Sequence, residues 1–307
     1  MSLPVTIEND HLKLDVWPQF GGKVASMVDK ADGFELLYNI PEELPTRCQY
    51  DMAYDAGFSS GWDECFPAVA PGAYPLHPYQ GVPIPDHGEL WPLPTTAVPT
   101  RDGITTVWHG LRFGYRLTRK LYLEGPAVVA EYTLINLAPF DFRFAWSPSL
   151  LLSTASPIEL ALADAPMAGG FLWPQVDAGT RFTTFDALPT GQAWSLLSDA
   201  PLTTPAVVRY PQRGRQLAIS YDSDDALRAW WTINLDTGTL AGNRHVSVAP
   251  ITARSESLNV AVDLDTAATV KASGRATWSM RVAVGPEGVS ERSTTASSVS
   301  SPVPGGG

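Results

Sequence analysis

The sequence predicts an all-β protein, built as one large antiparallel β-sandwich. The first observation behind this prediction is that 27 prolines and 25 glycines divide the 307 residues into short segments. Few of these segments run ten residues with a helical period. The second observation is that many of them alternate apolar and polar side chains, which is the period of a strand with one buried face. Such a density of strands is typical of a large sandwich or barrel.

The N-terminal half contains the clearest strand signals. Residues 12–16 alternate leucine or valine with lysine or aspartate, and the same pattern recurs over residues 115–123. The runs 24–27 and 35–38 flank the sequence Lys-Ala-Asp-Gly, which is typical of a hairpin turn. Residues 128–135 are rich in the β-branched side chains that strands favour. These segments are expected to form the first antiparallel strands of the sandwich.

The remaining predicted strands continue this rhythm to the end of one domain, which is expected to span residues 1–285. No internal repeat or convincing linker interrupts it. The segment 286–307 is rich in serine, threonine, proline and glycine and is predicted to be a disordered tail, because it has few apolar side chains to bury. The later expected strands are 142–146, 207–210, 216–221, 228–234, 245–248, 257–263 and 277–284.

Charge and composition exclude several classes of function. The formal net charge is −11, which disfavours nucleic acids and anionic membranes as partners. No run of about 18 apolar residues predicts a membrane span. The first residues lack the basic and apolar regions of a signal peptide, so we expect a cytoplasmic location with Cys48 and Cys65 as free thiols. Neither a CxxC nor an HxxxH motif occurs, so no metal or other cofactor is expected.

The best candidate site is the segment Pro-Asp-His-Gly-Glu-Leu-Trp at residues 85–91. It lies in a region, 40–100, that is rich in proline, glycine and aromatic residues and has little periodicity, as functional loops often do. Imidazole and carboxylate groups bond sugar hydroxyls, and an indole covers the apolar side of a sugar ring. We therefore expect His87 to be a catalytic residue, and we expect the substrate to be bound by Asp86, Glu89 and Trp91, with Gly88 allowing the backbone to approach the ligand.

A second cluster, Gly-Trp-Asp-Glu-Cys-Phe-Pro at residues 61–67, has the same blend of acids and aromatics. Asp63 and Glu64 are expected to bond substrate hydroxyls, with Trp146 and either Trp230 or Trp231 beside the cleft. Each cluster also has a plainer interpretation, in which the polar residues are solvated and the aromatic residues belong to the core. The occurrence of two such clusters close together in the sequence favours a function.

Several motifs resemble those of the galactose mutarotase-like superfamily, which contains the aldose 1-epimerases and hexose-6-phosphate mutarotases. Residues 20–27, Phe-Gly-Gly-Lys-Val-Ala-Ser-Met, are similar to the opening hairpin of that family. Residues 85–91 resemble its His-Gly segment followed by a tryptophan. Residues 131–136, Glu-Tyr-Thr-Leu-Ile-Asn, resemble its Tyr-x-Leu-x-Asn strand. The resemblance extends over most of residues 5–285 and implies an antiparallel sandwich with a sugar cleft on one broad face.

The chain departs from the family pattern at two positions that the resemblance makes important. Family enzymes carry a His-Pro whose histidine is the general acid, and this chain has Ser147 before Pro148. They also carry a Glu-Pro whose glutamate is the general base, and this chain has Ala249 before Pro250. Loss of either group would reduce the rate by about 10²–10⁴. Glu256 is a nearby glutamate, but its position does not match the motif.

The sequence therefore predicts an aldose 1-epimerase-like protein that binds a monosaccharide or sugar derivative, with weak or absent mutarotase activity. One alternative is an active aldose or hexose-phosphate epimerase that has relocated its acid and base. Another is a glycoside-cleaving enzyme that uses two of the carboxylates. A third is a purely structural sandwich without a small-molecule ligand.

Overall fold

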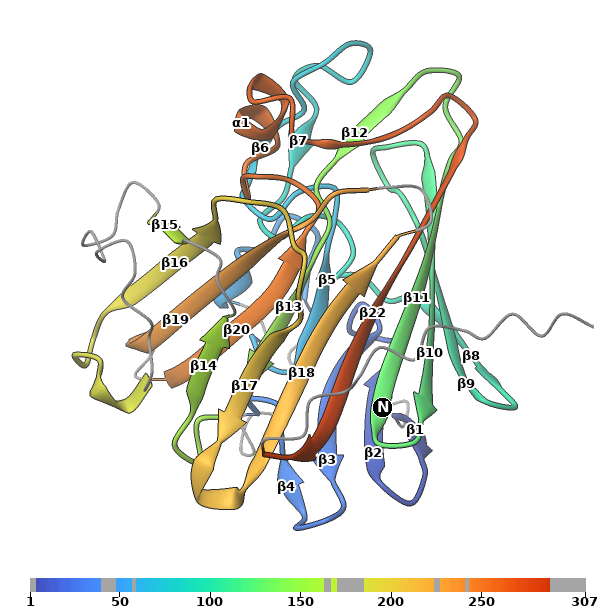
Figure 1. Ribbon diagram of the computed structural model, residues 1–307. Coiled ribbons are helices and arrows are strands. Elements are labelled where there is room, and N and C mark those ends of the chain that lie inside the picture. Colours follow the sequence, from blue (N-terminus) through green and yellow to red (C-terminus); the bar gives the residue numbers. More distant parts are fainter. Residues whose placement is uncertain are drawn as a thin grey trace, which may run out of the picture.

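The computed structural model describes residues 4–39, 48–56, 59–162, 167–169, 185–223, 227–240 and 243–287. Two large antiparallel sheets form the body of the molecule (Figure 1). Residues 288–307, which make up most of the predicted tail, lie outside the described residues.

The first sheet contains ten of the described strands. Its N-terminal strands occupy one side, and strands from the C-terminal half occupy the other. In spatial order they are β1 (Val5–Glu8), β2 (Leu12–Trp17), β3 (Lys23–Asp29), β5 (Trp62–Cys65), β13 (Ser147–Leu152), β20 (Asn243–Ile251), β19 (Trp230–Leu240), β16 (Ala193–Ser198) and β15 (Met167–Gly169), with β4 (Phe34–Glu35) paired to β3.

The second sheet contains eight of the described strands and faces the first. In order they are β14 (Glu159–Leu162), β17 (Ala206–Tyr210), β18 (Arg215–Asp222), β22 (Arg275–Pro286), β11 (Ala127–Asn136), β10 (Tyr115–Glu124), β9 (Gly103–His109) and β8 (Thr96–Thr100). The smaller elements are two strand pairs, β6 (Gly72–Ala73) with β7 (Pro83–Ile84) and β12 (Phe142–Phe144) with β21 (Ala268–Val270), the helix α1 (Leu258–Asp263) and the 3-10 turns Tyr54–Ala56, Phe185–Ala187 and Pro211–Arg213.

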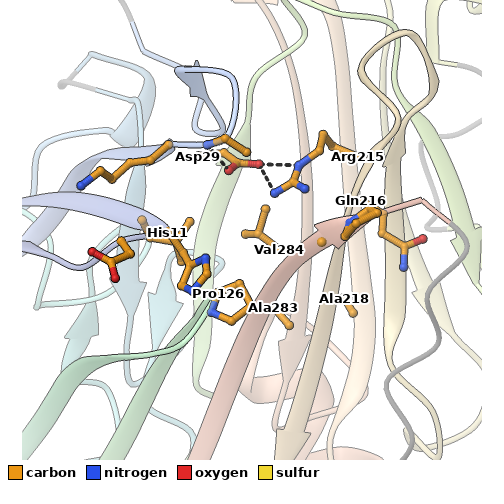
Figure 2. Close-up of a pocket in the computed structure, with 14 residues that line it drawn as sticks. His11, Asp29, Pro126, Arg215, Gln216, Ala218, Ala283 and Val284 are labelled. Atoms are coloured by element: carbon orange, nitrogen blue, oxygen red, sulfur yellow. Dashed lines mark hydrogen bonds and ion pairs between the residues drawn. The ribbon is translucent and has the colours of Figure 1, made fainter.

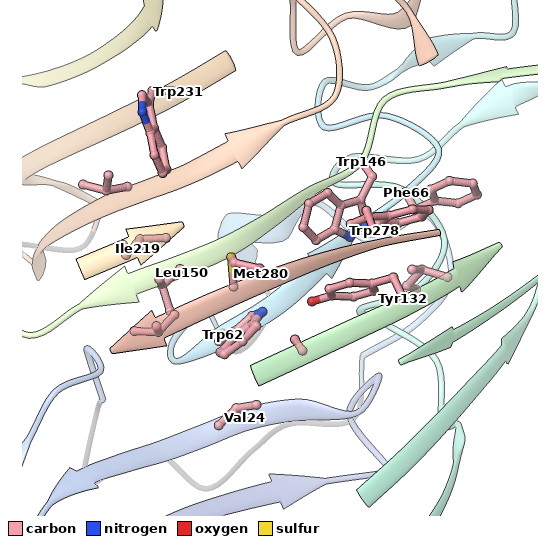
Figure 3. Close-up of a cluster of buried hydrophobic side chains, with 14 of the residues drawn as sticks. Val24, Trp62, Phe66, Tyr132, Trp146, Leu150, Ile219, Trp231, Trp278 and Met280 are labelled. Carbon is pink, nitrogen blue, oxygen red and sulfur yellow. The ribbon is translucent and has the colours of Figure 1, made fainter. Parts of the chain in front are cut away.

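Large aromatic side chains fill much of the core between the sheets (Figure 3). Trp146, which immediately precedes β13, lies 5.3 Å from the ring of Trp278 on β22. Tyr132 on β11 stacks on Trp278 at 5.3 Å with the ring planes 8° apart. Because these rings come from both sheets, their burial fixes the distance between the layers, and each such pair adds about 0.5–1.5 kcal/mol beyond its area burial.

Alternation along the central strands decides which side chains face this core. On β13, Leu150 and Leu152 belong to the core cluster, whereas Ser147 and Ser149 point to the outer face of the first sheet. The period of two in a strand makes this separation automatic. The outer face of the first sheet is therefore polar where the inner face is apolar.

The segment 257–263, predicted as a strand, is instead the helix α1. The N–H of Ala261 donates to the carbonyl of Ser257 at 2.9 Å, and the N–H of Leu264 donates to Val260 at 3.0 Å. Leu258 and Ala261 are both buried. Their spacing of three places both on one face of a helix, and a strand would have separated them. Among the described residues, no helix is long and apolar enough to cross a membrane.

Candidate functional site

A cleft of about 420 Å³ lies on the outer face of the first sheet, above β5, β13, β20 and β19. Its floor is made by the outward-facing residues of these strands. The residues of its wall are Tyr54, Asp55, Ser59, Val69, Ala70, Pro71, Asp86, His87 and Glu256. The floor carries several hydroxyl and amide side chains beside apolar ones. The hydroxyl and amide side chains are those of Ser147 and Ser149 from β13, Ser247 from β20, and Thr232 and Asn234 from β19.

Asp86 and His87 form one wall of the cleft, and both are half-buried. The two side chains are joined by a 2.8 Å hydrogen bond between Nδ1 of His87 and Oδ1 of Asp86. Tyr54 stacks on the imidazole at 3.9 Å, and its N–H donates to Oδ2 of Asp86 at 2.8 Å. Burial alone would raise the pKa of Asp86, but the bonds and charge of His87 and the N–H of Tyr54 hold it below its ordinary value.

The backbone at His87 and Gly88 has a left-handed conformation and packs against the backbone of Phe66. His87 has a φ of 58°, in the left-handed region. Gly88 has a φ of 79°, and a Cβ there would collide with the carbonyl oxygen of Phe66. The glycine therefore admits the backbone of Phe66, whereas the sequence suggested a ligand in that role. The N–H of Glu89 donates to the same carbonyl at 2.8 Å.

Glu256 reaches the floor from the loop between β20 and α1, whose backbone is bonded to Val69 and Ala70. Its Oε1 lies 3.3 Å from Oγ1 of Thr232 and 3.4 Å from Nδ2 of Asn234. Thr232 is the cross-strand partner of Ala249. The carboxylate of Glu256 therefore lies beside the strand position at which the sequence resemblance places a missing glutamate.

His245 also lines the cleft, from β20 beyond Ser247. It is 9% exposed, and its buried Nδ1 has no hydrogen-bond partner among the described residues. Burial lowers the pKa of His245, with the charge of Asp236 acting in the opposite direction. The imidazole is therefore neutral near pH 7.

Cys65 closes the floor from β5 and is fully buried. Burial raises the pKa of its thiol well above the ordinary value, and the charges of Asp63 and Glu64 act in the same direction. A thiol that stays protonated is a poor nucleophile. Both Cys65 and Cys48 are free cysteines.

Asp63 and Glu64, which the sequence suggested as hydroxyl-binding residues, are buried beneath the site. Asp63 accepts hydrogen bonds from the ammonium of Lys23 and from the hydroxyl of Tyr54, the latter at 3.0 Å. Burial raises the pKa of Asp63, while the Lys23 charge opposes this effect. The side chain is held within the protein and does not line the cleft.

Glu64 faces the opposite way, into the core, and is completely inaccessible. Nη1 of Arg119 lies 2.9 Å from its Oε1, and the hydroxyl of Tyr132 lies 2.8 Å from the same oxygen. Oε2 accepts from the indole of Trp146 at 2.8 Å. Burial raises the pKa of Glu64, and the Arg119 charge counteracts it. A carboxylate with this set of partners can be charged in a core.

Glu89 is likewise a structural acid, 3% exposed. Its carboxylate accepts from the hydroxyls of Tyr50 and Tyr115, each at 3.0 Å. It also accepts from the N–H groups of Leu111 and Arg112, at 3.2 Å and 3.0 Å. These bonds fasten the loop after β9 to the candidate segment, so Glu89 organises the backbone behind the cleft.

The tryptophans proposed as sugar platforms lie in apolar clusters and not among the residues that line the cleft. Trp91 is 2% exposed, and its Nε1 donates to the carbonyl of Asp86 at 2.9 Å. Trp146 and Trp231 belong to the main core. Trp230 packs in a small cluster with Cys65, also buried. Of the residues proposed from the sequence, the structure brings Asp86 and His87 to the cleft.

The sequence interpretation gave no role to Thr232, Asn234, Ser247 or His245. The available signal was alternation, because polar residues occupy every second position between apolar ones in both strands. Any sheet with one solvated face gives the same pattern. The signal therefore could not distinguish a ligand-binding floor from an ordinary outer surface.

A second cavity, of about 400 Å³, lies between the two sheets where the β2–β3 hairpin meets β18 and β22 (Figure 2). Its buried charges satisfy each other: Nε of Arg215 donates to Asp29 at 2.6 Å. Lys30, at its edge, bonds the carbonyl of Asn9 at 2.8 Å. The pair of Asp29 on β3 with Arg215 on β18 joins the two sheets. The described residues contain no group of three or more His, Cys, Asp or Glu side chains placed to hold a metal ion.

Several solved structures share this architecture at low sequence identity. The Slr1438 protein from Synechocystis sp. PCC 6803 is 18% identical, with a TM-score of 0.68 over 93% of this chain and 97% of that chain. A galactose mutarotase-like protein from Lactobacillus casei ATCC 334 is 16% identical, with a TM-score of 0.68 over 92% and 100%. A candidate aldose 1-epimerase from Escherichia coli K12 is 14% identical, with a TM-score of 0.65 over 92% and 99%.

No family model matches the sequence, and no curated protein matches it either. The structural likeness shows that the chain has the fold of the galactose mutarotase-like proteins. The predicted antiparallel β-sandwich is thereby confirmed.

Proposed function

We propose that this chain binds a monosaccharide or sugar derivative in the outer cleft of the first sheet. The observation that supports this most strongly is the set of hydroxyl, amide, imidazole and carboxylate groups that converge on one cavity. Sugar hydroxyls both donate and accept, so they require such a mixture of partners. The groups are Ser147, Ser149, Thr232, Asn234, Ser247, His87, His245 and Glu256. The names of the structural neighbours agree with a carbohydrate ligand.

We propose that this cleft catalyses mutarotation only weakly. The reaction needs a base that takes the proton of the anomeric hydroxyl and an acid that protonates the ring oxygen. The hydroxyl of Ser147 does not titrate near neutrality, and the side chain of Ala249 has no titratable group. Ser147 lies on the cleft floor, while Ala249 is fully buried. Neither residue supplies the proton transfer that the corresponding family residues perform.

A second candidate function is an active aldose epimerase with a relocated acid and base. The observation that favours it is the carboxylate of Glu256, bonded to Thr232 directly across from Ala249. His87 is the accompanying acid, because its ring is half-exposed in the cleft and oriented by Asp86. Glycoside cleavage by Asp63, Glu64 and Glu89 is not proposed, since all three are buried and held by internal partners.

Two measurements test these functions separately. Calorimetric titration with glucose and galactose measures binding, and failure of every tested aldose to bind at millimolar concentration would overturn the proposal. Polarimetry on freshly dissolved α-anomers measures mutarotation. We expect slow anomer exchange that rises most when Ser147→His and Ala249→Glu are combined, since acid and base act on one transition state. Fast exchange that Glu256→Gln abolishes would favour the second candidate.

A further inference from the structure

The fixed charges that line the cleft are all negative. Asp55, Asp86 and Glu256 contribute carboxylates, and the described lining residues include no lysine or arginine. Lys23 lies beneath the floor, but its ammonium bonds Asp63 and the carbonyl of Ser60. An anionic ligand entering the cleft would therefore meet a surplus of negative charge, because His87 is bonded to Asp86 and three carboxylates line the cleft.

A group of acids does not by itself define a ligand, and the hydrogen bonding of Glu256 adds specific information. Each oxygen of Asp86 has a short hydrogen bond of 2.8 Å, one with His87 and one from the N–H of Tyr54. Glu256 has only the two neutral contacts at 3.3 Å and 3.4 Å, which are at the long limit of a hydrogen bond. Within the described residues no ion pair involves it. A carboxylate with two oxygens can accept about four hydrogen bonds, so Glu256 has spare acceptor capacity and an uncompensated charge.

His245 provides an independent indication that a ligand occupies the same cavity. The residue is 91% buried and lines the cleft, and its Nδ1 has no partner in the part of the chain that the structure describes. An unsatisfied buried polar atom is unfavourable unless water or a ligand completes it. Because burial keeps this imidazole neutral near pH 7, it does not offset the charge of Glu256. The side chains bonded to the Glu256 carboxylate, Thr232 and Asn234, are both neutral.

We propose that the ligand supplies a positive group: the cleft is specific for an aldose that carries a primary ammonium, an amino sugar. This inference rests on the proposed sugar binding and names its ligand class. The ammonium donates to Glu256, and the sugar hydroxyls bond the serines, Asn234 and His245. Hydrogen bonds between an ammonium and a carboxylate are shorter and roughly twice as strong as neutral ones. Sugar phosphates and uronic acids are excluded by the surplus of acids.

The test is calorimetric titration at about pH 6.5 and low salt with four compounds: glucose, glucosamine, N-acetylglucosamine and glucose 6-phosphate. N-acetylglucosamine keeps the nitrogen but lacks the charge. We expect glucosamine to bind at least about tenfold more tightly than glucose. N-acetylglucosamine should bind no better than glucose, and glucose 6-phosphate should bind more weakly than glucose.

The variant Glu256→Gln keeps the size and the acceptor oxygen of the side chain but removes its charge. It should abolish the preference, so that the variant binds glucosamine no more tightly than glucose whatever the variant's affinity for glucose itself. The matched control is Glu8→Gln, which removes an exposed carboxylate from β1, outside the cleft, and should keep the preference. In the wild-type chain, added salt should reduce the preference, because an ammonium–carboxylate pair in an open cleft is screened.

Each other outcome identifies which idea fails. Equal binding of glucose and glucosamine by the wild-type chain overturns the ammonium inference and leaves sugar binding intact. A preference that survives in Glu256→Gln removes Glu256 from the role of ammonium partner. Absence of binding by all four compounds overturns the proposed function together with this inference. If Glu256→Gln does not fold, the salt dependence of the wild-type preference still decides the question.

Discussion

Glu64 and Glu256 are the same residue type in two opposite environments. Glu64 lies at the centre of the core, where Arg119 neutralises it and three further donors, Tyr132, Trp62 and Trp146, surround it. Glu256 lies at the cleft with two long bonds to neutral side chains. The comparison shows that partners within the chain, more than the presence of an acid, separate structural carboxylates from those available to a ligand.

Asp63 and Glu64 show how little separates the two environments along the chain. They are adjacent in β5, so their side chains point to opposite faces of the sheet. Glu64 enters the core, while Asp63 lies under Tyr54 on the side of the cleft. A cation is buried with each of them, Arg119 and Lys23. The following predictions test buried and cleft-lining residues, from the largest expected effect to the smallest.

The largest effect is expected from Arg119→Met, which leaves Glu64 buried without its cation. Removing one partner of a buried pair destabilises a protein by about 3–5 kcal/mol. Urea unfolding measures the loss. The control is Arg281→Met, which breaks an exposed pair with Glu124 and should change stability by less than about 1 kcal/mol. Similar losses in both variants would contradict the structural role assigned to the Glu64 network.

Trp91→Ala should also destabilise the fold strongly, because it empties a buried site. Loss of a core tryptophan removes about 3–5 kcal/mol, and the hydrogen bond from Nε1 to the carbonyl of Asp86 is lost as well. Thermal melting detects this change. Under conditions where the variant remains folded, its affinity for sugar should be close to that of the wild-type chain. A stable variant that no longer binds sugar would show that Trp91 contributes to the ligand site.

The pH dependence of stability should carry a signature of His245. Burial lowers the pKa of this histidine in the folded chain, so the unfolded chain binds the proton more readily. Stability is therefore complete above the unfolded value of about 6.5 and falls by up to about 1.4 kcal/mol per pH unit as the pH drops below it. Unfolding free energies from pH 8 to pH 5 measure this slope. In His245→Gln the decline should be shallower, and an identical slope would show that folding does not lower the pKa of this histidine.

The smallest effect is expected from His87→Asn, which removes an imidazole at the cleft. Asparagine tolerates the left-handed backbone conformation that position 87 has. If His87 bonds the sugar, affinity should fall by about 0.5–1.5 kcal/mol. Calorimetric titration measures the loss, and thermal melting should show a change much smaller than that of Trp91→Ala. Unchanged affinity would place the ligand away from the Asp86–His87 wall.

Local patterns were sufficient to predict most of the strands. Period-two alternation over residues 12–16 and 115–123 corresponds to β2 and β10, and the turn after residue 29 joins β3 to β4. The error at residues 257–263 shows the limit of this reasoning. Leucine and valine at every second position fit a strand, but the hydrogen bonds of α1 and the burial of Leu258 with Ala261 make a helical turn.

The candidate site was predictable only where a loop carried its own signal. Asp86 and His87 were identified because an acid, an imidazole and a glycine are adjacent in a loop. The acids of residues 63, 64 and 89 had the same local signal, but their partners come from distant strands: Glu64 meets Arg119, which lies 55 positions away. These side-chain pairs cannot be identified from the sequence alone.

The sequence by itself determined the fold class of this protein, because strand periodicity and turn residues act over a few positions. The tertiary structure alone decided which acids are buried and paired and which are open to a ligand. Charge compensation depends on distances between side chains that are remote along the chain, and it is set only when the sheets pack. That is why Glu256, outside every recognised motif, lies at the cleft, while Glu64, inside one, lies in the core.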